Sequence, residues 1–283
     1  MRTLVRAIIL SAALVGAAPG AFAADLPVKA PPLAYAPLPN WSGFYIGGNI
    51  GGAWGSNSAS FSGDAPTAVF FANNEFPTSL GTNPKGVIGG GQFGYNWQIS
   101  PRWLIGLETD LQASSFKGSA AATPTPGPVP FVPFTTSVEE HSNWFGTLRG
   151  RVGFEPTPSL LLYGTAGLAY GQTETSFNAI ATGFTLGTCP GNFTCTVAAA
   201  STTKIGWTAG AGAEWMFLPR WSVKAEYLYV DLGNQSATGT PTPGGVATFP
   251  NMFFTATAPF HESIVRVGIN YHFDWGGPIV ARY

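Results

Sequence analysis

Nine titratable side chains in this sequence could act together, because they recur at alternate positions within apolar segments. Three times, two of them lie two residues apart, as Glu108 and Asp110 do. Side chains two residues apart point to the same face of a β-strand. The full set is Glu108, Asp110, Arg149, Arg151, Glu214, Lys224, Glu226, Arg266 and His272. Four acids, four bases and one histidine on a shared face could form ion pairs, or could line a path for charged solutes.

A second group of residues could do nucleophilic chemistry. Glu139, Glu140, His141 and Ser142 are consecutive and include an orienting carboxylate, a base and a nucleophile. Such triads are recognised by geometry, however, and adjacency in sequence does not supply it. The simpler interpretation is a polar strand end. We therefore predict that the protein is not an enzyme and uses no cofactor.

The two cysteines, Cys189 and Cys195, lie close together in "CPGNFTC". In an oxidising, exported setting this spacing indicates a disulfide that closes a small loop. Two free thiols are the alternative. A metal site would need further ligands, and none is suitably spaced nearby, so no metal is predicted.

The chain begins with features of a secretory signal peptide. Arg2 and Arg6 precede an apolar run over residues 7–18, and Ala21 and Ala23 form a small-x-small cleavage signal. The alternative, a membrane anchor, would need about 20 apolar residues. We expect a signal peptide over residues 1–23, followed by an extended proline-rich leader over residues 24–40.

The composition is unusual for a water-soluble domain. Charged residues make up 10% of the chain, against about 25% in typical soluble domains. No later run is long and apolar enough for a spanning helix, so any membrane role must use strands. The net charge of -1, without a basic stripe, gives no reason to expect a nucleic-acid partner.

Eight stretches show the two-residue alternation of strands. They cover approximately residues 43–54, 86–98, 102–112, 142–154, 159–171, 204–217, 220–231 and 262–273. Short proline-centred turns, "QISPRW", "FEPTPS" and "FLPRW", alternate with four longer segments of roughly thirty residues that are rich in Gly, Pro, Ser and Thr. Long loops at one end and tight turns at the other are typical of an outer-membrane barrel.

The stretches have one apolar face, and the nine titratable residues lie on the other. Leu104 and the run of Leu160, Leu161 and Leu162 break the alternation. Aromatic residues gather near the strand ends, at Trp54, Trp97, Trp103, Trp144, Trp215, Trp221 and Tyr271. Aromatic girdles of this kind sit at lipid headgroups. Because an open sheet in hydrocarbon would leave unpaired backbone groups, the strands must close into a barrel. We therefore predict an all-β, eight-stranded antiparallel transmembrane barrel whose apolar face meets lipid.

Two interpretations of the inward charges stay open. An eight-stranded barrel has an interior that side chains can fill, which favours a salt-bridged plug. A narrow polar channel for small solutes is the alternative, with room for water left by inward glycines: Gly47, Gly51, Gly206, Gly210 and Gly212.

The sequence resembles the outer membrane immunogenic protein family of small porin-like barrels. The similarity rests on "ADLPVKAP" after the signal peptide, "NWSGFYIGGNIGGAWG" at 40–55, "VIGGGQFGYNWQ" at 87–98, and "VRVGINYHF" with the closing "GGPIVARY". It implies an eight-stranded barrel in the outer membrane, exposed at the surface, with a role in envelope integrity or modest solute passage. Outer-membrane lipid is the implied partner, and the barrel assembly machinery is expected to act during biogenesis.

The end of the chain departs from a simple final strand. Both Phe273 and Tyr283 could carry the aromatic assembly signal, but Gly276, Gly277 and Pro278 argue against one continuous strand between them. We place the barrel at residues 41–273 and a tail at 274–283.

Overall fold

The computed structural model describes residues 40–125, 134–181, 194–242 and 253–273. The expected signal peptide, the proline-rich leader up to residue 39 and the tail after residue 273 lie outside these ranges. The elements are β1 (Gly43–Trp54), β2 (Asn57–Gly63), α1 (Ala68–Ala72), β3 (Ser79–Thr82), β4 (Lys85–Ser100), β5 (Trp103–Ala122), β6 (Phe134–Thr157), β7 (Leu160–Ala181), β8 (Thr194–Leu218), β9 (Trp221–Pro241) and β10 (Phe254–His272). In the described ranges, no helix has both the length and the apolar character needed to cross a membrane.

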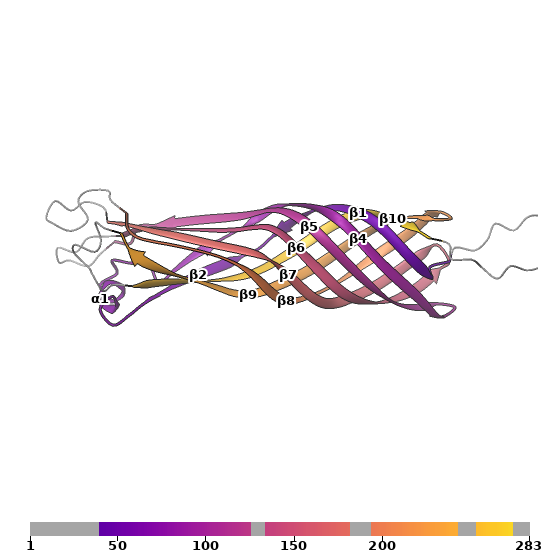
Figure 1. The fold of residues 1–283 in the computed structure, drawn as a ribbon, viewed down its shortest axis with the longest axis horizontal. Helices are drawn as coiled ribbons and strands as arrows, with labels where there is room; N and C mark the ends of the chain where they lie inside the picture. Colours follow the sequence, from indigo (N-terminus) through magenta and orange to yellow (C-terminus); the bar gives the residue numbers. More distant parts are fainter. Residues whose placement is uncertain (1–39, 126–133, 182–193, 243–252, 274–283) are drawn as a thin grey trace, which may run out of the picture. The chain divides into compact units, whose positions relative to one another are not determined.

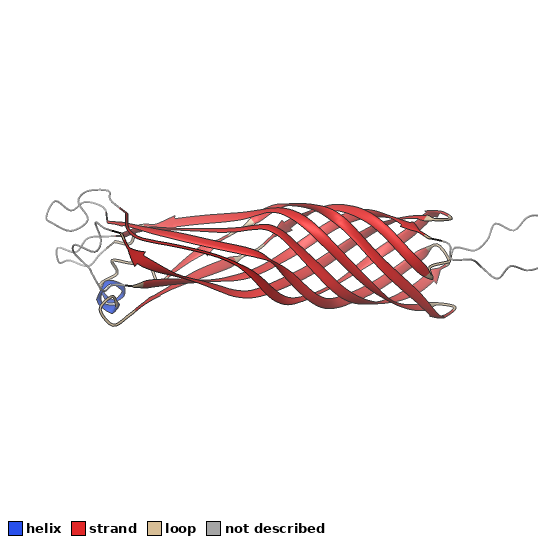
Figure 2. Cartoon of the chain, viewed as in Figure 1, coloured by secondary structure: helices blue, strands red, loops and turns tan. Residues whose placement is uncertain are grey.

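Eight of the strands close into a ring (Figures 1 and 2). Each pairs antiparallel with its neighbours in the order β1-β4-β5-β6-β7-β8-β9-β10, and β10 returns to pair with β1. In this closing ladder Ile46 is opposite Tyr271, Ile50 is opposite Val267, and Trp54 is opposite Ser263. The predicted all-β, eight-stranded antiparallel barrel is confirmed.

Alternation along the strands separates two faces. In β5 every second side chain from Leu104 to Gln112 is buried, and those between are exposed. In β10, Val265 and Val267 are 48% and 52% exposed, while Arg266 between them is 1% exposed. Apolar side chains therefore form the outside of the barrel and charged ones lie inside, the reverse of a soluble sheet.

Tight turns join the strands at one end of the barrel, as predicted. Pro101 and Arg102 link β4 to β5, Pro158 and Ser159 link β6 to β7, and residues 219–220 link β8 to β9. Proline suits the second position of such turns because its φ is already near the required value.

The four long segments were predicted as loops, and for part of each segment this is wrong. Strands continue the barrel wall past the predicted ends: β6 begins at Phe134 and β7 ends at Ala181. Beyond β1 and β4, the hairpin of β2 and β3 continues the wall, because β2 pairs with the start of β10. We call this part of the barrel, beyond Trp54 and Trp144, the extension.

Side chains explain why the extension forms strands. Its outer face carries small hydroxyl residues that pair across strands, as Thr238 does with Thr255 at 3.0 Å. Its inner face carries an aromatic cluster in which Phe76 stacks on Phe254, with ring centroids 4.4 Å apart. In the extension the polar face is outside and the apolar face is inside, as in a soluble sheet. The same strands therefore have their apolar face outside in the membrane-spanning part and inside in the extension.

Candidate functional site

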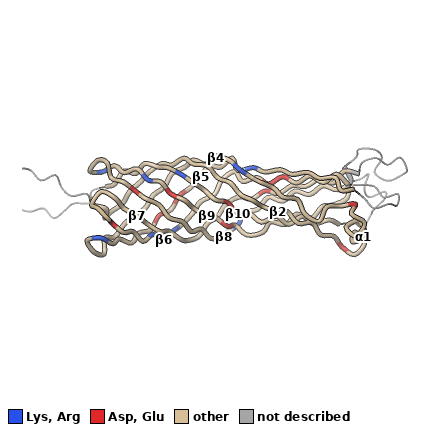
Figure 3. Tube along the Cα trace, turned by 180° about the vertical axis from the view of Figure 1, so that it is seen from behind, with Lys and Arg blue, Asp and Glu red and all other residues tan. Residues whose placement is uncertain are grey.

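Eight charged side chains from β5, β6, β8, β9 and β10 meet inside the barrel. We call them the interior charge cluster: Glu108, Asp110, Arg149, Arg151, Glu214, Lys224, Glu226 and Arg266. Each side chain is at most 3% exposed. Acidic and basic segments interleave on neighbouring strands, while most of the trace is uncharged (Figure 3). Four carboxylates balance four cations, so the ionised cluster has no net charge.

Arg149 lies at the centre of the cluster. Its Nη1 donates to Oε1 of Glu226 at 2.9 Å, and its Nη2 donates to Oδ2 of Asp110 at 2.9 Å and also to Glu108. Its Nε donates to the hydroxyl of Thr147 at 2.9 Å. One guanidinium therefore bridges three carboxylates, a geometry that its planar fork of donors allows.

The carboxylates around Arg149 are shared with other cations. Arg266 donates from Nη2 to Asp110 at 2.9 Å and from Nε to Glu226 at 2.7 Å. Lys224 donates from Nζ to Oε1 of Glu108 at 3.0 Å. The cluster is thus a network rather than a set of separate pairs, and removal of one member unbalances several others.

Two tyrosines complete the network around Arg151. Arg151 donates to Oε2 of Glu214 at 3.0 Å and to the hydroxyl of Tyr45 at 2.8 Å, and its guanidinium lies 4.0 Å from the ring centroid of Tyr163. The Tyr45 hydroxyl in turn donates to Glu108 at 2.7 Å. Neither tyrosine was predicted as a site residue, although their alternation with outward residues would have placed them inside.

His272 joins the cluster at its edge through the Glu214 carboxylate and the Ser222 hydroxyl. Its Nε2 lies 3.3 Å from Oε1 of Glu214 and 2.9 Å from Oγ of Ser222. Asn270 donates to the same Glu214 oxygen at 2.7 Å and accepts from Gln92 at 2.7 Å. The structure therefore brings all nine predicted inward residues into one hydrogen-bonded region.

Apolar layers close the barrel on both sides of the charge cluster. Toward the turns, Trp41 is fully buried, and its Nε1 donates to the carbonyl of Pro158 at 3.0 Å. It packs with Leu104, Leu161, Tyr163 and Met216. Toward the extension lies a second layer of Ala53, Ile88, Phe116, Phe145, Ala169, Leu228, Val230, Leu232, Phe260 and Ile264. Charged and apolar layers thus follow one another along the interior.

The inward glycines do not leave room for water, so that expectation is wrong. At Gly47, Gly206 and Gly210 a methyl group would collide with a neighbouring strand or side chain. At Gly212 it would lie 2.6 Å from the ring of Tyr163, and at Gly51 it would lie 2.7 Å from Cβ of Arg266. Glycine instead lets large side chains lie against the wall.

The seven predicted girdle residues lie at two levels on the outer face. Five are near the turns, where Trp221 packs edge-on to Tyr271 with centroids 5.1 Å apart. These five are Trp97, Trp103, Trp215, Trp221 and Tyr271, while Trp54 and Trp144 lie at the other level. Trp144 contacts Tyr170, and Trp207 contacts Tyr229, at centroid distances of 6.3 and 5.4 Å. Exposed aliphatic side chains such as Ile50 and Val267 fill the band between, which we call the apolar band.

The residues considered for catalysis are split between the two faces of β6. Glu140 and Ser142 are buried inside, whereas Glu139 is exposed and His141 is half-buried on the outer face. The imidazole Nε2 of His141 is 2.6 Å from Oδ1 of Asn143. A base and a nucleophile on opposite faces of a strand cannot form a triad. Within the described ranges, no group of three His, Cys, Asp or Glu residues could hold a metal ion.

The predicted disulfide stays a prediction. Cys189 lies outside the described residues, and the side chain of Cys195, near the start of β8, is not described either.

Glu140 of β6 ties the β2–β3 hairpin of the extension to the barrel wall. Its Oε2 accepts from Nδ2 of Asn57 on β2 at 2.8 Å, and its Oε1 accepts from Oγ1 of Thr82 on β3 at 2.7 Å. Burial raises the pKa of this carboxyl, and the two hydrogen bonds offset that effect in part. Alternation along β6 was enough to predict that Glu140 points inward. Its hydrogen-bond partners could not be predicted, because Asn57 and Thr82 lie in a segment that was expected to be a loop.

Replacing Glu140 by alanine should free the β2–β3 hairpin, because two hydrogen bonds to a charged acceptor are lost. We expect amide hydrogen exchange at residues 57–63 and 79–82 to accelerate at least about tenfold. Glutamine should preserve protection, since Oδ1 of Asn57 has no partner among the described residues and can accept from the new amide. Because the folded-state pKa is raised, protection in the unaltered protein should increase as the pH falls through that pKa. The glutamine variant should show no such dependence, and equal dependence in both would contradict the role of Glu140.

Comparison with known proteins agrees with this architecture. A family model for the outer membrane protein beta-barrel domain matches residues 8–273. The 31 kDa outer-membrane immunogenic protein of Brucella melitensis is 35% identical over 271 residues, covering 95% of this chain and 100% of that protein. The 22 kDa outer membrane protein of Rhizobium leguminosarum is 30% identical over 211 residues, covering 74% of this chain and 69% of that protein.

The similarity to solved structures is weaker. The outer membrane protein OprG from Pseudomonas aeruginosa is 13% identical, with a TM-score of 0.45, over 83% of this chain and 99% of that one. The family match and the sequence identity to the Brucella protein each extend across nearly the whole chain. This chain belongs to the outer-membrane β-barrel family and is an integral protein of the outer membrane.

Proposed function

We propose that this protein is a closed structural barrel that anchors in the outer membrane and presents a surface outside it. The observation that carries the proposal is the filling of the interior by successive layers. Trp41 and its neighbours fill the turn end, the interior charge cluster follows, and Phe116 and Phe145 lie beyond it. Packed interiors of this kind support the plug, and small-solute conduction is not favoured.

The extension supports the surface role. Strands that continue beyond the membrane hold their outer residues in a fixed arrangement, which flexible loops would not do. The Brucella relatives are named immunogenic proteins, which fits exposure of this part at the cell surface. We propose that barrel and extension together contribute to envelope integrity without catalysis.

Biogenesis is proposed to use the barrel assembly machinery, with Phe273 as the aromatic signal. Phe273 directly follows the last strand, is 41% exposed, and donates its backbone N–H to the carbonyl of Phe44 on β1 at 2.9 Å. It thereby lies at the seam where the barrel closes.

Electrical recording in planar bilayers tests the closed barrel directly. We expect no conductance steps from the mature chain after a heat-dependent gel shift has shown that it is folded. A conducting porin prepared in the same way is the positive control. Reproducible steps whose ion preference changes in an Arg151→Ala variant would establish the channel and overturn this proposal.

A further inference from the structure

A row of polar side chains crosses the outer face of five strands at one level. Lys85 of β4 is opposite Lys117 of β5, which is opposite His141 of β6. The row continues to Glu174 of β7 and Ser201 of β8. We call these five residues the polar row.

The polar row lies at the edge of the apolar band. Lys85 is directly opposite Trp54 of the aromatic girdle. The next outward residue of β4 is Val87, which is 65% exposed and belongs to the apolar band. Since girdle tryptophans sit at headgroup depth, the lysines lie where lipid headgroups meet water.

Two like charges directly opposite each other destabilise a sheet unless something compensates them. Among the ion pairs of the described residues, Lys85 has none, and Lys117 reaches Glu139 at 3.7 Å with both side chains more than half exposed. Such an exposed pair contributes little. Glu139 also lies on β6, on the side of β5 away from Lys85. The seam between β4 and β5 is therefore left positive, and two adjacent ammonium groups suit a phosphate.

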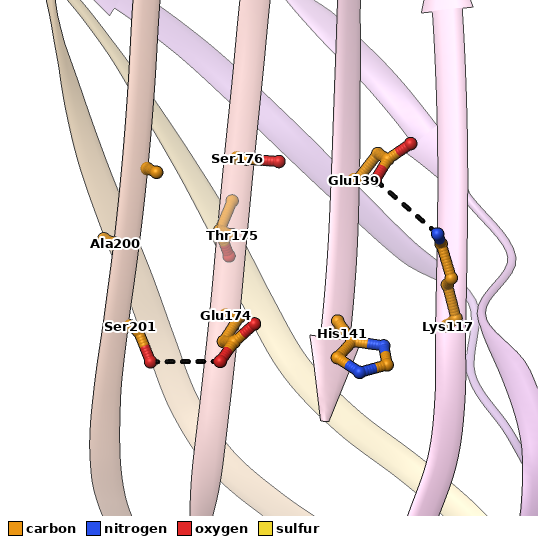
Figure 4. Close-up of a pocket in the computed structure, with 9 residues that line it drawn as sticks. Lys117, Glu139, His141, Glu174, Thr175, Ser176, Ala200 and Ser201 are labelled. Atoms are coloured by element: carbon orange, nitrogen blue, oxygen red, sulfur yellow. Dashed lines mark hydrogen bonds and ion pairs between the residues drawn. The ribbon is translucent and has the colours of Figure 1, made fainter. Parts of the chain in front are cut away.

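A pocket adjoins Lys117 on the β6 side (Figure 4). Its volume is about 490 Å³, and its lining includes Lys117, Glu139, His141, Glu174 and Ser201. Ser201 donates from Oγ to Oε1 of Glu174 at 3.3 Å, so the carboxylate is already oriented. Carboxylates, hydroxyls and an imidazole are the partners that sugar hydroxyls would take, since a hydroxyl both donates and accepts.

We propose that the polar row binds the headgroup of a phosphorylated glycolipid in the outer leaflet. Lys85 and Lys117 hold the phosphate, and the pocket beside Glu139 and Glu174 takes the sugar hydroxyls. The phosphate belongs to a lipid and is not free phosphate, because the apolar surface around Val87 lies next to the lysines on the membrane side and accepts the acyl chains. This inference goes beyond the closed barrel and does not depend on whether the interior conducts.

Native mass spectrometry of the full barrel in detergent micelles tests the site, with diphosphoryl lipid A as the probe. The unaltered protein should retain one lipid A molecule in preference to phosphatidic acid, which carries the phosphate without the sugar. The Lys85→Gln/Lys117→Gln variant should bind lipid A about thirtyfold more weakly, the loss expected for two lysines at a membrane surface. The Glu139→Gln/Glu174→Gln variant should lose the preference for lipid A over phosphatidic acid.

Matched controls make the result decisive. Arg102→Gln removes an exposed cation from the turn between β4 and β5 at the other end of the barrel, and should leave binding unchanged. All variants should show the heat-dependent gel shift of a folded barrel, since the altered side chains lie at the surface. Equal retention by the lysine variant, equal retention of phosphatidic acid by the unaltered protein, or displacement of lipid A by an equal concentration of inorganic phosphate would overturn the assignment.

Discussion

Replacing Arg149 by alanine will lower the free energy of unfolding of the barrel by about 3–5 kcal/mol. This side chain is fully buried and donates to Glu108, Asp110 and Glu226. Without it, three carboxylates share the remaining cations, and the cluster carries an uncompensated negative charge inside a layer closed to water. Urea unfolding of the protein refolded in lipid vesicles, followed by tryptophan fluorescence, measures the change.

Two further variants separate charge from packing in this experiment. Asp110→Ala combined with Arg149→Ala restores neutrality, so the double variant should be more stable than the sum of the single losses implies. Lys117→Ala removes an exposed cation of the extension and should change stability little. Additive losses, or an Arg149→Ala variant as stable as Lys117→Ala, would mean that the cluster does not hold the barrel together.

Alternation with a period of two was enough to predict the membrane-spanning part. Leu104 and the run Leu160, Leu161 and Leu162 were the ambiguous positions, because they broke the pattern. In the structure Leu104 and Leu161 are fully buried in the layer beneath Trp41, while Leu162 is 44% exposed on the outer face. Leu104 and Leu161 depart from the rule that apolar residues point outward, because the interior of the barrel has apolar layers of its own. Composition alone does not reveal these layers.

Two features depend on registers that a sequence does not display. Alternation shows which face of the strand a residue lies on, but not its position along the barrel axis. The three carboxylate partners of Arg149 therefore could not be assigned from the sequence. The polar row aligns only because bulges in β5 and β6, between Ala113 and Phe116 and near Asn143, shift the ladders. The extension was missed for a different reason: its Gly, Pro, Ser and Thr content is typical of loops, and the phenylalanines that bury its inner face lie far apart in the chain.

The second large effect is expected for an arginine substitution at Val267, which lies on the outer, apolar face of the barrel. Val267 lies opposite Ile50, halfway along the closing ladder between Ile46 opposite Tyr271 and Trp54 opposite Ser263. Its side chain is 52% exposed on the outer face, so it should meet hydrocarbon near the middle of the bilayer. Arginine at this depth costs about 2–4 kcal/mol on the lipid face of a barrel, and we expect Val267→Arg to be destabilised by that amount.

Depth and polarity are controlled on the same strand. Ser263→Arg places the same side chain on the same face at the level of Trp54, where the guanidinium can reach water, and should cost only about 0–1 kcal/mol. Val267→Leu keeps the position apolar and should be close to neutral. The same urea titration in vesicles measures all three. Arg266, one residue away, is buried in the charge cluster, so Val267 points outward. If the Val267→Arg variant were as stable as Val267→Leu, this outward face would not meet lipid.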